Sequence, residues 1–102
     1  MVPVKYEIPG QGKVIGFYGK DAQSMVHMEE CAELIQAISK MRRVRDAGED
    51  DGEAYYNLVE EMADVLICME QLKYMYQIAD HEIQGMIYKK CARQEERMHG
   101  YV

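Results

Sequence analysis

The segment Met28–Met41, MEECAELIQAISKM, has a near-copy at Val59–Leu72, VEEMADVLICMEQL. Both copies carry two carboxylates three residues apart, followed by apolar residues at helical spacing. The aligned positions are Glu29 with Glu60, Glu30 with Glu61, Ala32 with Ala63, Glu33 with Asp64, Leu34 with Val65, Ile38 with Met69, and Met41 with Leu72. The near-repeat predicts two amphipathic helices of the same design.

Each acidic pair lies beside an apolar stripe. Residues three apart project from the same side of a helix, so Glu30 points with Glu33, and Glu61 points with Asp64. The stripe residues are His27, Cys31, Leu34, Ile38 and Met41 in the first copy, and Leu58, Met62, Val65, Met69, Leu72 and Tyr76 in the second. Such stripes face a core. If the two stripes pack together, the four carboxylates converge beside one hydrophobic seam.

A cluster of four carboxylates needs protons or a cation. Two like charges about 4 Å apart repel by up to roughly 4 kcal/mol at an effective dielectric constant near 20. Oxygen ligands without a neighbouring His or Cys pattern favour Mg²⁺, with Mn²⁺ as the alternative, over zinc. The competing interpretation is that each acidic pair decorates a solvated helix face. The repetition in the same register beside the seam favours the metal site.

The paired motifs resemble those of a known family. Glu30-x-x-Glu33 followed by Glu61-x-x-Asp64 is similar to the E-x-x-E…E-x-x-D signature of the MazG-like all-α nucleoside triphosphate pyrophosphohydrolases. The surrounding words EECAELIQAISK and EEMADVLICMEQL look like the two motif helices of that family. The resemblance implies an all-α, antiparallel helical bundle with tandem motif helices.

The C-terminal part of the chain extends this resemblance. Lys90, Gln94 and Arg97 match the family's Lys, Asn and Arg at the same spacing, except that Gln94 replaces the commoner Asn. The three side chains share one helix face at i, i+4 and i+7. Solvation, with pairing to Glu95 or Glu96, is the alternative to a phosphate contact. The resemblance covers about residues 18–98.

The resemblance implies Mg²⁺-dependent hydrolysis of an NTP or dNTP to the monophosphate and pyrophosphate, in nucleotide-pool house-cleaning. The implied site residues are Glu30, Glu33, Glu61 and Asp64 as metal ligands, Glu33 or Glu61 as the base, and Lys90, Gln94 and Arg97 as phosphate contacts. Gln23 and Lys40 lie two helical turns before Glu30 and after Glu33 on the same side, so each is either a substrate contact or an exposed surface residue.

The chain divides into an N-terminal arm, residues 1–20, and a helical domain, residues 21–102. The arm contains β-like runs at Val2–Ile8 and Lys13–Tyr18 around a Pro-Gly turn, which predicts a hairpin or an irregular arm. The predicted helices are Ala22–Arg45, Ala54–Ile78 and Asp80–Met98, with Asp21 and Asp80 as N-caps. The acidic stretch between the first two is a solvated loop.

Composition narrows the class of protein. The chain has 102 residues, and its net charge of −6 argues against nucleic acid or an anionic membrane as partner. No apolar run approaches the roughly 20 residues of a membrane span, and we expect no signal peptide. Cys31, Cys68 and Cys91 lack the spacing of a metal site, which indicates reduced, packed thiols in a cytoplasmic protein.

The second predicted helix is apolar around much of its circumference. Besides its stripe it carries Val59, Ala63, Leu66 and Ile67 on another side. A domain of this size cannot cover such a helix alone. We therefore expect a homodimer or homotetramer.

Two other classes of protein compete with the enzyme. A diiron or dimanganese carboxylate bundle needs Glu-x-x-His on two helices, and the sequence has no such pairing. A non-catalytic helical module for oligomerisation or regulation is the stronger alternative. Metal-dependent release of pyrophosphate distinguishes it from the enzyme.

Overall fold

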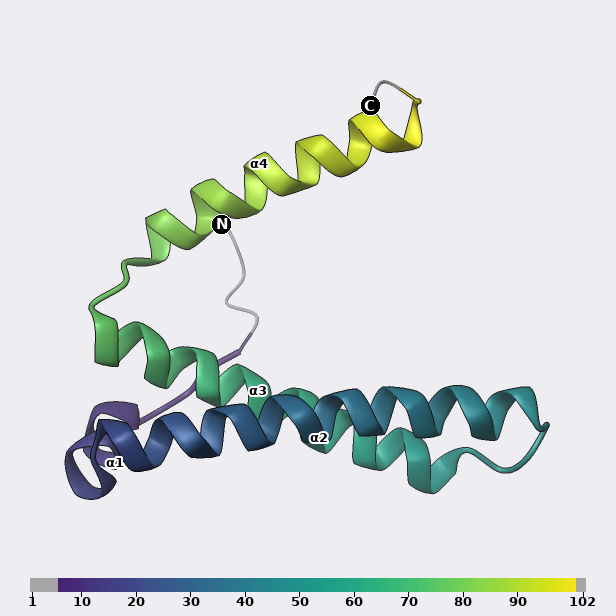
Figure 1. The fold of residues 1–102 in the computed structure, drawn as a ribbon, viewed down its shortest axis with the longest axis horizontal. Helices are drawn as coiled ribbons and strands as arrows, with labels where there is room; N and C mark the ends of the chain where they lie inside the picture. The colour runs from purple at the N-terminus through teal and green to yellow at the C-terminus, as the bar shows by residue number, and fades with distance from the viewer. Residues whose placement is uncertain (1–5, 101–102) are drawn as a thin grey trace.

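The computed structural model describes residues 6–100, which form an all-helical fold (Figure 1). The helices, in chain order, are α1 (Gln11–Tyr18), α2 (Lys20–Asp46), α3 (Gly52–Tyr76) and α4 (Asp80–Met98). The described range contains no strand, so the predicted all-α class is confirmed. None of the helices in this range is both long and apolar enough to cross a membrane.

Helices α2 and α3 form an antiparallel pair joined by the acidic loop (Figure 1). The loop is held by its own side chains: Arg45 Nε donates to Asp51 Oδ2 at 2.7 Å, and Asp50 Oδ1 accepts from Gly52 N–H at 3.0 Å. Gly48 supplies the left-handed backbone of the turn, with φ of 69°. The two long helices predicted from the near-repeat are therefore present, with ends shifted by one or two residues.

The start of α2 and the end of α3 differ from the prediction, and the backbone conformation explains the difference at the end of α3. Asp21 is not the N-cap of α2: Gly19, with φ of 87°, has that place, and Asp21 lies in the first turn. Helix α3 ends at Tyr76, two residues before the predicted Ile78, because Gln77 adopts a left-handed φ of 55°. Helix α4 has the predicted bounds.

Asp80 is the first residue of α4 rather than its N-cap. Ala79 is the N-cap, and Glu82 Oε2 accepts a hydrogen bond from its N–H at 2.8 Å. The carboxylate of Glu82 therefore satisfies one of the free N–H groups at the start of the helix.

Of the two alternatives predicted for the N-terminal arm, the hairpin is wrong where the structure describes it, and the irregular arm is present only at residues 6–10. Residues 2–5 of the first β-like run lie outside the described range, residues 6–8 form no strand, and the second run, Lys13–Tyr18, belongs to helix α1. Helix α1 contacts both α2 and α3, and it buries Ile15. Gly12 permits this approach, since a Cβ there would lie 3.0 Å from the Tyr74 ring. Tertiary packing overrides the local preference for a strand.

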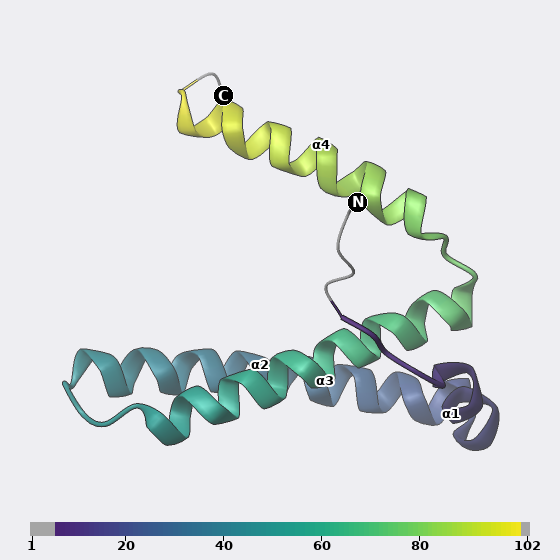
Figure 2. The same ribbon diagram turned by 180° about the vertical axis from the view of Figure 1, so that it is seen from behind.

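The segment before α1 crosses α3 (Figure 2). Tyr6 lines a hollow there with Val59, Met62 and Leu66 of α3. Three of the many large apolar side chains on α3 are thus partly covered by the chain's own arm. Val59 and Met62 are nevertheless each 50% exposed.

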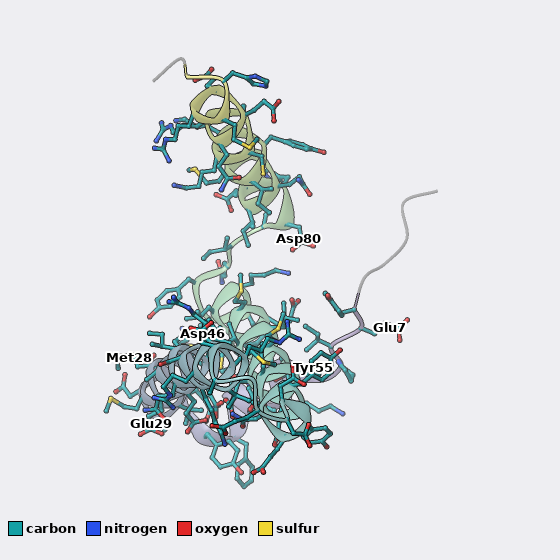
Figure 3. The ribbon with its side chains drawn as sticks, turned by 90° about the vertical axis from the view of Figure 1, so that its right-hand side faces the viewer. Glu7, Met28, Glu29, Asp46, Tyr55 and Asp80 are labelled. Atoms are coloured by element: carbon teal, nitrogen blue, oxygen red, sulfur yellow. The ribbon has the colours of Figure 1, made fainter. Side chains whose placement is uncertain are left out.

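Helix α4 stands apart from the other three (Figures 1 and 3). Apart from the ion pair of its first residue, it packs against none of them, and all of its residues are exposed except the half-buried Ile83. The radius of gyration is 17.0 Å, whereas a compact domain of this length has about 13 Å. The α2–α3 pair with α1 is therefore the packed body, and α4 is an outlying helix.

The three cysteines are free thiols. Cys68 is buried in the α2–α3 seam, as predicted, but Cys31 and Cys91 are exposed, so the prediction of packed thiols is wrong for these two. For Cys91 the reason is the unpacked state of α4.

Candidate metal centre

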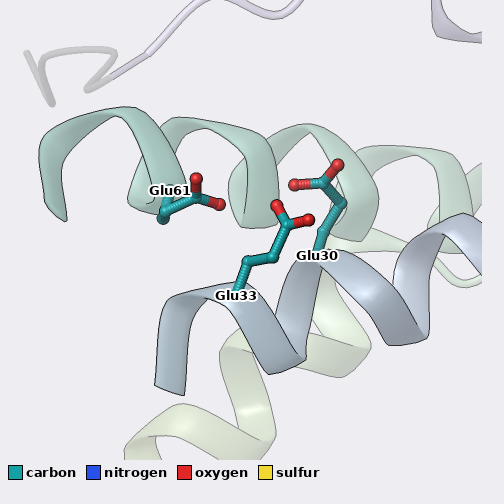
Figure 4. Close-up of side chains that lie close together, drawn as sticks. All are labelled: Glu30, Glu33 and Glu61. Atoms are coloured by element: carbon teal, nitrogen blue, oxygen red, sulfur yellow. The ribbon is translucent and has the colours of Figure 1, made fainter. Parts of the chain in front are cut away.

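Three carboxylates from two helices meet in the middle of the α2–α3 pair. Glu30 and Glu33 extend from α2 and Glu61 extends from α3, and the three side chains point toward one another (Figure 4). One carboxylate oxygen from each lies within 4.8 Å of the others. The structure therefore brings together three of the four predicted metal ligands.

The heptad register of the helices places two of these carboxylates in the seam. Glu30 lies midway between Gln23 and Ala37, which are 8% and 2% exposed. On α3 the residues spaced by seven are Ala54, Glu61, Cys68 and Met75, of which all but Glu61 are buried. Positions spaced by seven keep one face toward a packed partner helix. Glu30 and Glu61 therefore occupy core positions where other proteins place apolar residues.

Burial and mutual repulsion disfavour the charged forms of these carboxyl groups. The pKa of Glu30 is raised to about 7, chiefly by burial and then by the charges of Asp64 and Glu33. Burial, followed by the charge of Glu33, also raises the pKa of Glu61. Without a cation, the cluster relieves this repulsion by retaining a proton.

Two oxygen atoms of the cluster have no partner. Glu30 Oε2 and Glu61 Oε2 are buried, and neither has a hydrogen bond within the described part of the chain. A buried carboxylate oxygen without a partner costs free energy unless a proton or a cation satisfies it. These two atoms are the clearest sign that the cluster is built around a positive charge.

Asp64, the fourth predicted ligand, lies at the edge of the cluster. It is not among the three carboxylates within 4.8 Å of one another, but its charge raises the pKa of both Glu30 and Glu61. Asp64 lies three residues after Glu61, so the two side chains leave α3 on the same side and the charge of Asp64 stays close to the cluster. The four acids thus form one electrostatic unit.

The donor atoms fit a hard divalent cation. The cluster offers carboxylate oxygens, the ligands that Mg²⁺ and Mn²⁺ prefer. Burial, followed by the charge of Glu30, raises the pKa of the nearby Cys68 thiol to about 11, so the thiol stays protonated beside the cluster when no metal is bound. A thiol must lose its proton to bind a metal.

A buried polar network next to the cluster was not predicted from the sequence. Gln71 Oε1 accepts hydrogen bonds from Gln23 Nε2 at 3.1 Å and from His27 Nε2 at 2.7 Å, and Gln71 Nε2 donates to Gln11 Oε1 at 2.7 Å. The network ties α1 and α2 to α3. Gln23 is therefore buried rather than exposed, and one N–H of its amide nitrogen bonds to Gln71.

The sequence did contain a signal for this network. His27 lies four residues after Gln23, so these two share a face of α2. Gln71 lies seven residues after Asp64, so it shares the face of α3 that carries this motif residue. One atom of the network has no partner: His27 Nδ1 is buried without a hydrogen bond from the described residues.

The predicted phosphate contacts lie elsewhere. Lys90, Gln94 and Arg97 are exposed on α4, away from the helices that hold the carboxylates (Figure 3). Lys40 is half-buried on α2, two turns beyond Glu33. Within one chain the structure brings the acids together but leaves the α4 residues apart from them.

No protein-family model, curated protein or solved structure matches this chain. The chemistry of the carboxylate cluster therefore carries the functional inference.

Proposed function

We propose that the protein is a Mg²⁺-dependent nucleoside triphosphate pyrophosphohydrolase that acts as a homo-oligomer in nucleotide-pool house-cleaning. The reaction converts an NTP or dNTP to its monophosphate and pyrophosphate. The observation that carries the proposal is the pair of buried, unpartnered oxygens on Glu30 and Glu61. They belong to an E-x-x-E and an E-x-x-D motif that resemble those of the MazG-like enzymes.

The residues that would hold the metal are Glu30, Glu33, Glu61 and Asp64. Bound there, Mg²⁺ supplies positive charge to the polyphosphate oxygens and lowers the pKa of a coordinated water. The acids alone would repel a triphosphate, which carries roughly four negative charges. Mn²⁺ satisfies the same oxygen donors.

Glu33 is the best placed of the acids to take the proton of the attacking water. One of its oxygens lies in the cluster, yet its side chain is exposed. Glu61, the other candidate base, has one oxygen buried in the seam. A base that faces both the reacting water and the solvent can pass the proton on after each turnover. The water oxygen then bonds to phosphorus as pyrophosphate departs.

The test is product analysis with purified protein. A panel of NTPs and dNTPs is incubated with Mg²⁺, and pyrophosphate and orthophosphate are measured separately. We expect pyrophosphate with an equal amount of monophosphate, lost when the metal is chelated. Orthophosphate alone would contradict the proposed bond cleavage.

A matched pair of variants links the activity to the cluster. Glu61→Gln removes a carboxylate of the cluster, whereas Glu60→Gln removes its exposed neighbour. We expect only Glu61→Gln to abolish pyrophosphate release. A protein that releases no product and binds no Mg²⁺ in calorimetry would instead be a non-catalytic helical module.

A further inference from the structure

Two thiols lie at nearly the same level of the α2–α3 pair, one on each helix. His27 of α2 bonds to Gln71 of α3, with its Nε2 2.7 Å from Gln71 Oε1, and this bond fixes the level at which the helices pair. Cys31 lies one helical turn after His27, and Cys68 lies about one turn before Gln71. Because the helices are antiparallel (Figure 1), both steps run in the same direction in space. Cys31 and Cys68 are therefore neighbours across the seam.

The electrostatic environment of Cys68 agrees with this placement. Burial is the largest cause of its raised pKa, and the charges of Glu30, Cys31 and Asp64 add to the effect. A charged group shifts a pKa strongly only when it lies a short distance away. Cys31 is thus close to Cys68, and both lie beside the carboxylate cluster.

The two thiols differ in their access to solvent. Cys31 is exposed, whereas Cys68 is only 4% exposed. Cys31 also lines a hollow of about 520 Å³ on the surface of the pair, together with His27, Leu72 and Tyr76. A small oxidant in the solvent therefore reaches the sulfur of Cys31 before that of Cys68.

The same hollow contains a proton acceptor. Gln71 Oε1 can only accept a hydrogen bond, so His27 Nε2 donates to it, and Nδ1 of the neutral ring keeps its lone pair. His27 is 4% exposed, and its Nδ1 has no hydrogen bond from the described residues. This nitrogen is available to take a proton from a thiol one helical turn away. The deprotonated thiol is the form that attacks an oxidant.

We propose that Cys31 is a site of oxidation by peroxide and that Cys68 converts the product to a disulfide between α2 and α3. The sulfur of Cys31 attacks one oxygen of hydrogen peroxide, the O–O bond breaks, and a sulfenic acid and water form. The sulfur of Cys68 then bonds to that of Cys31, and the sulfenic oxygen leaves as water with the proton of Cys68. Two thiols are oxidised, and one peroxide is reduced to two waters.

The disulfide joins the two helices that carry the carboxylate cluster, next to Glu30. Its formation requires no nucleotide and no metal, so this modification is independent of the proposed hydrolysis.

Peroxide treatment of the reduced full-length chain tests the proposal. Cys91→Ser serves as the background, because Cys91 is the other exposed thiol. After treatment with hydrogen peroxide, the remaining thiols are alkylated with N-ethylmaleimide in denaturant, and intact and peptide masses are measured. We expect a chain that is lighter by two hydrogen atoms, has no alkylated thiol and contains linked Cys31 and Cys68 peptides. It should run as a single chain on a non-reducing denaturing gel.

Two further variants in this background establish the order of the steps. With Cys31→Ser, Cys68 should remain a thiol and be fully alkylated, because it is buried. With Cys68→Ser, Cys31 should stop at the sulfenic acid, which dimedone traps. Circular dichroism checks that both variants keep the helical content of the background protein.

Three results would overturn the proposal. One is full alkylation of both Cys31 and Cys68 after peroxide treatment. Another is a disulfide that links Cys31 of two different chains, seen as a doubled mass on the non-reducing gel. The third is equal oxidation of Cys68 with and without Cys31, because the exposed thiol would then have no part in the reaction.

Discussion

The α2–α3 pair and helix α4 use the same kind of sequence in opposite ways. Both have an apolar strip bordered by charged residues, but α2 and α3 pack together along part of theirs and bury Ala37, Cys68 and Met75, whereas that of α4 is bare. Ile38, Met62 and Met69 of the predicted stripes are still about half exposed, so these stripes are only partly covered within one chain.

In the packed pair, acids occupy core positions, where burial and mutual repulsion raise the pKa values of Glu30 and Glu61. On α4, cations lie beside the half-buried Ile83 and the exposed Ile87. The difference is therefore one of packing: the α2–α3 pair has a core within the chain, and α4 has none.

The largest expected effect comes from removing a carboxylate of the cluster on the α2–α3 pair. Asp64→Asn should lower the turnover number by at least about 100-fold, the typical loss when a charged group at a reacting centre is removed. The fold should remain, because loss of a like charge relieves repulsion on Glu30 and Glu61. Steady-state pyrophosphate release and circular dichroism measure the two outcomes. Turnover retained at the wild-type level would contradict the site assignment.

The next effect tests the claim that α1, α2 and α3 form one internally bonded body. Gln71→Ala leaves Gln23, His27 and Gln11 without their shared partner, which should lower the free energy of unfolding by about 1–3 kcal/mol in urea titrations. Gln36→Ala, at an exposed position of α2, should change it by less than about 0.5 kcal/mol. Equal effects of the two changes would mean that the network contributes nothing specific.

Loss of a phosphate-binding cation from α4 should lower the activity but not the stability of the protein. Lys90→Ala should lower kcat/KM about tenfold, because one charge-assisted contact to a phosphate oxygen is lost. Lys89→Ala removes the same charge from the adjacent position, which faces another side of α4, and should leave kcat/KM unchanged. Both residues are exposed, so the melting temperatures should agree. A matching loss in both variants would point to a general effect of charge.

The smallest effect concerns the pH dependence of stability in the packed pair. Folded Glu30 holds its proton up to a pKa of about 7, whereas the unfolded chain releases it near the ordinary value of 4.5. The folded state therefore binds more protons between these values, and the melting temperature of the metal-free protein should fall as the pH rises through this range. Differential scanning calorimetry in a chelator measures the slope, and Glu30→Gln should flatten it.

Magnesium should reverse this trend. A metal ion takes the place of the proton, so the stabilisation by Mg²⁺ should grow as the pH rises toward 7. Glu29→Gln, at the exposed position beside Glu30, should keep the wild-type behaviour. A stabilisation by Mg²⁺ that is independent of pH would contradict the assignment of the proton to the cluster.

The near-repeat made much of the site predictable. Its spacing placed Glu30, Glu33 and Glu61 on facing sides of two helices, and the structure brings these three together with Asp64 beside them. Periodicity also predicted the bounds of α4 and, within two residues, those of α2 and α3. These features depend on local pattern and on the pairing of two sequential helices, which adjacent sequence can encode.

The features that the sequence did not reveal depend on contacts between distant residues. Helix α1 has the composition of a strand and becomes helical against α2 and α3, where Gln11 bonds to Gln71. Gln23 was expected at the surface and is buried by the same network. The direction of α4 depends on the left-handed backbone of Gln77 and on the ion pair between Lys73 and Asp80. A hydrophobic pattern reveals neither of these.

Because the apolar strip of α4 has no packed partner within the described part of the chain, we expect the folding of α4 to depend on protein concentration. An isolated helix of its length, 19 residues, is only marginally stable in water, since it has backbone hydrogen bonds but no packed face. In the proposed homo-oligomer, dilution below the dissociation constant should remove order from α4 first, while the α2–α3 pair keeps its structure. A nucleotide that binds the assembled form more tightly than the single chain would stabilise that form by mass action. The substrate itself would then favour the folded state of α4.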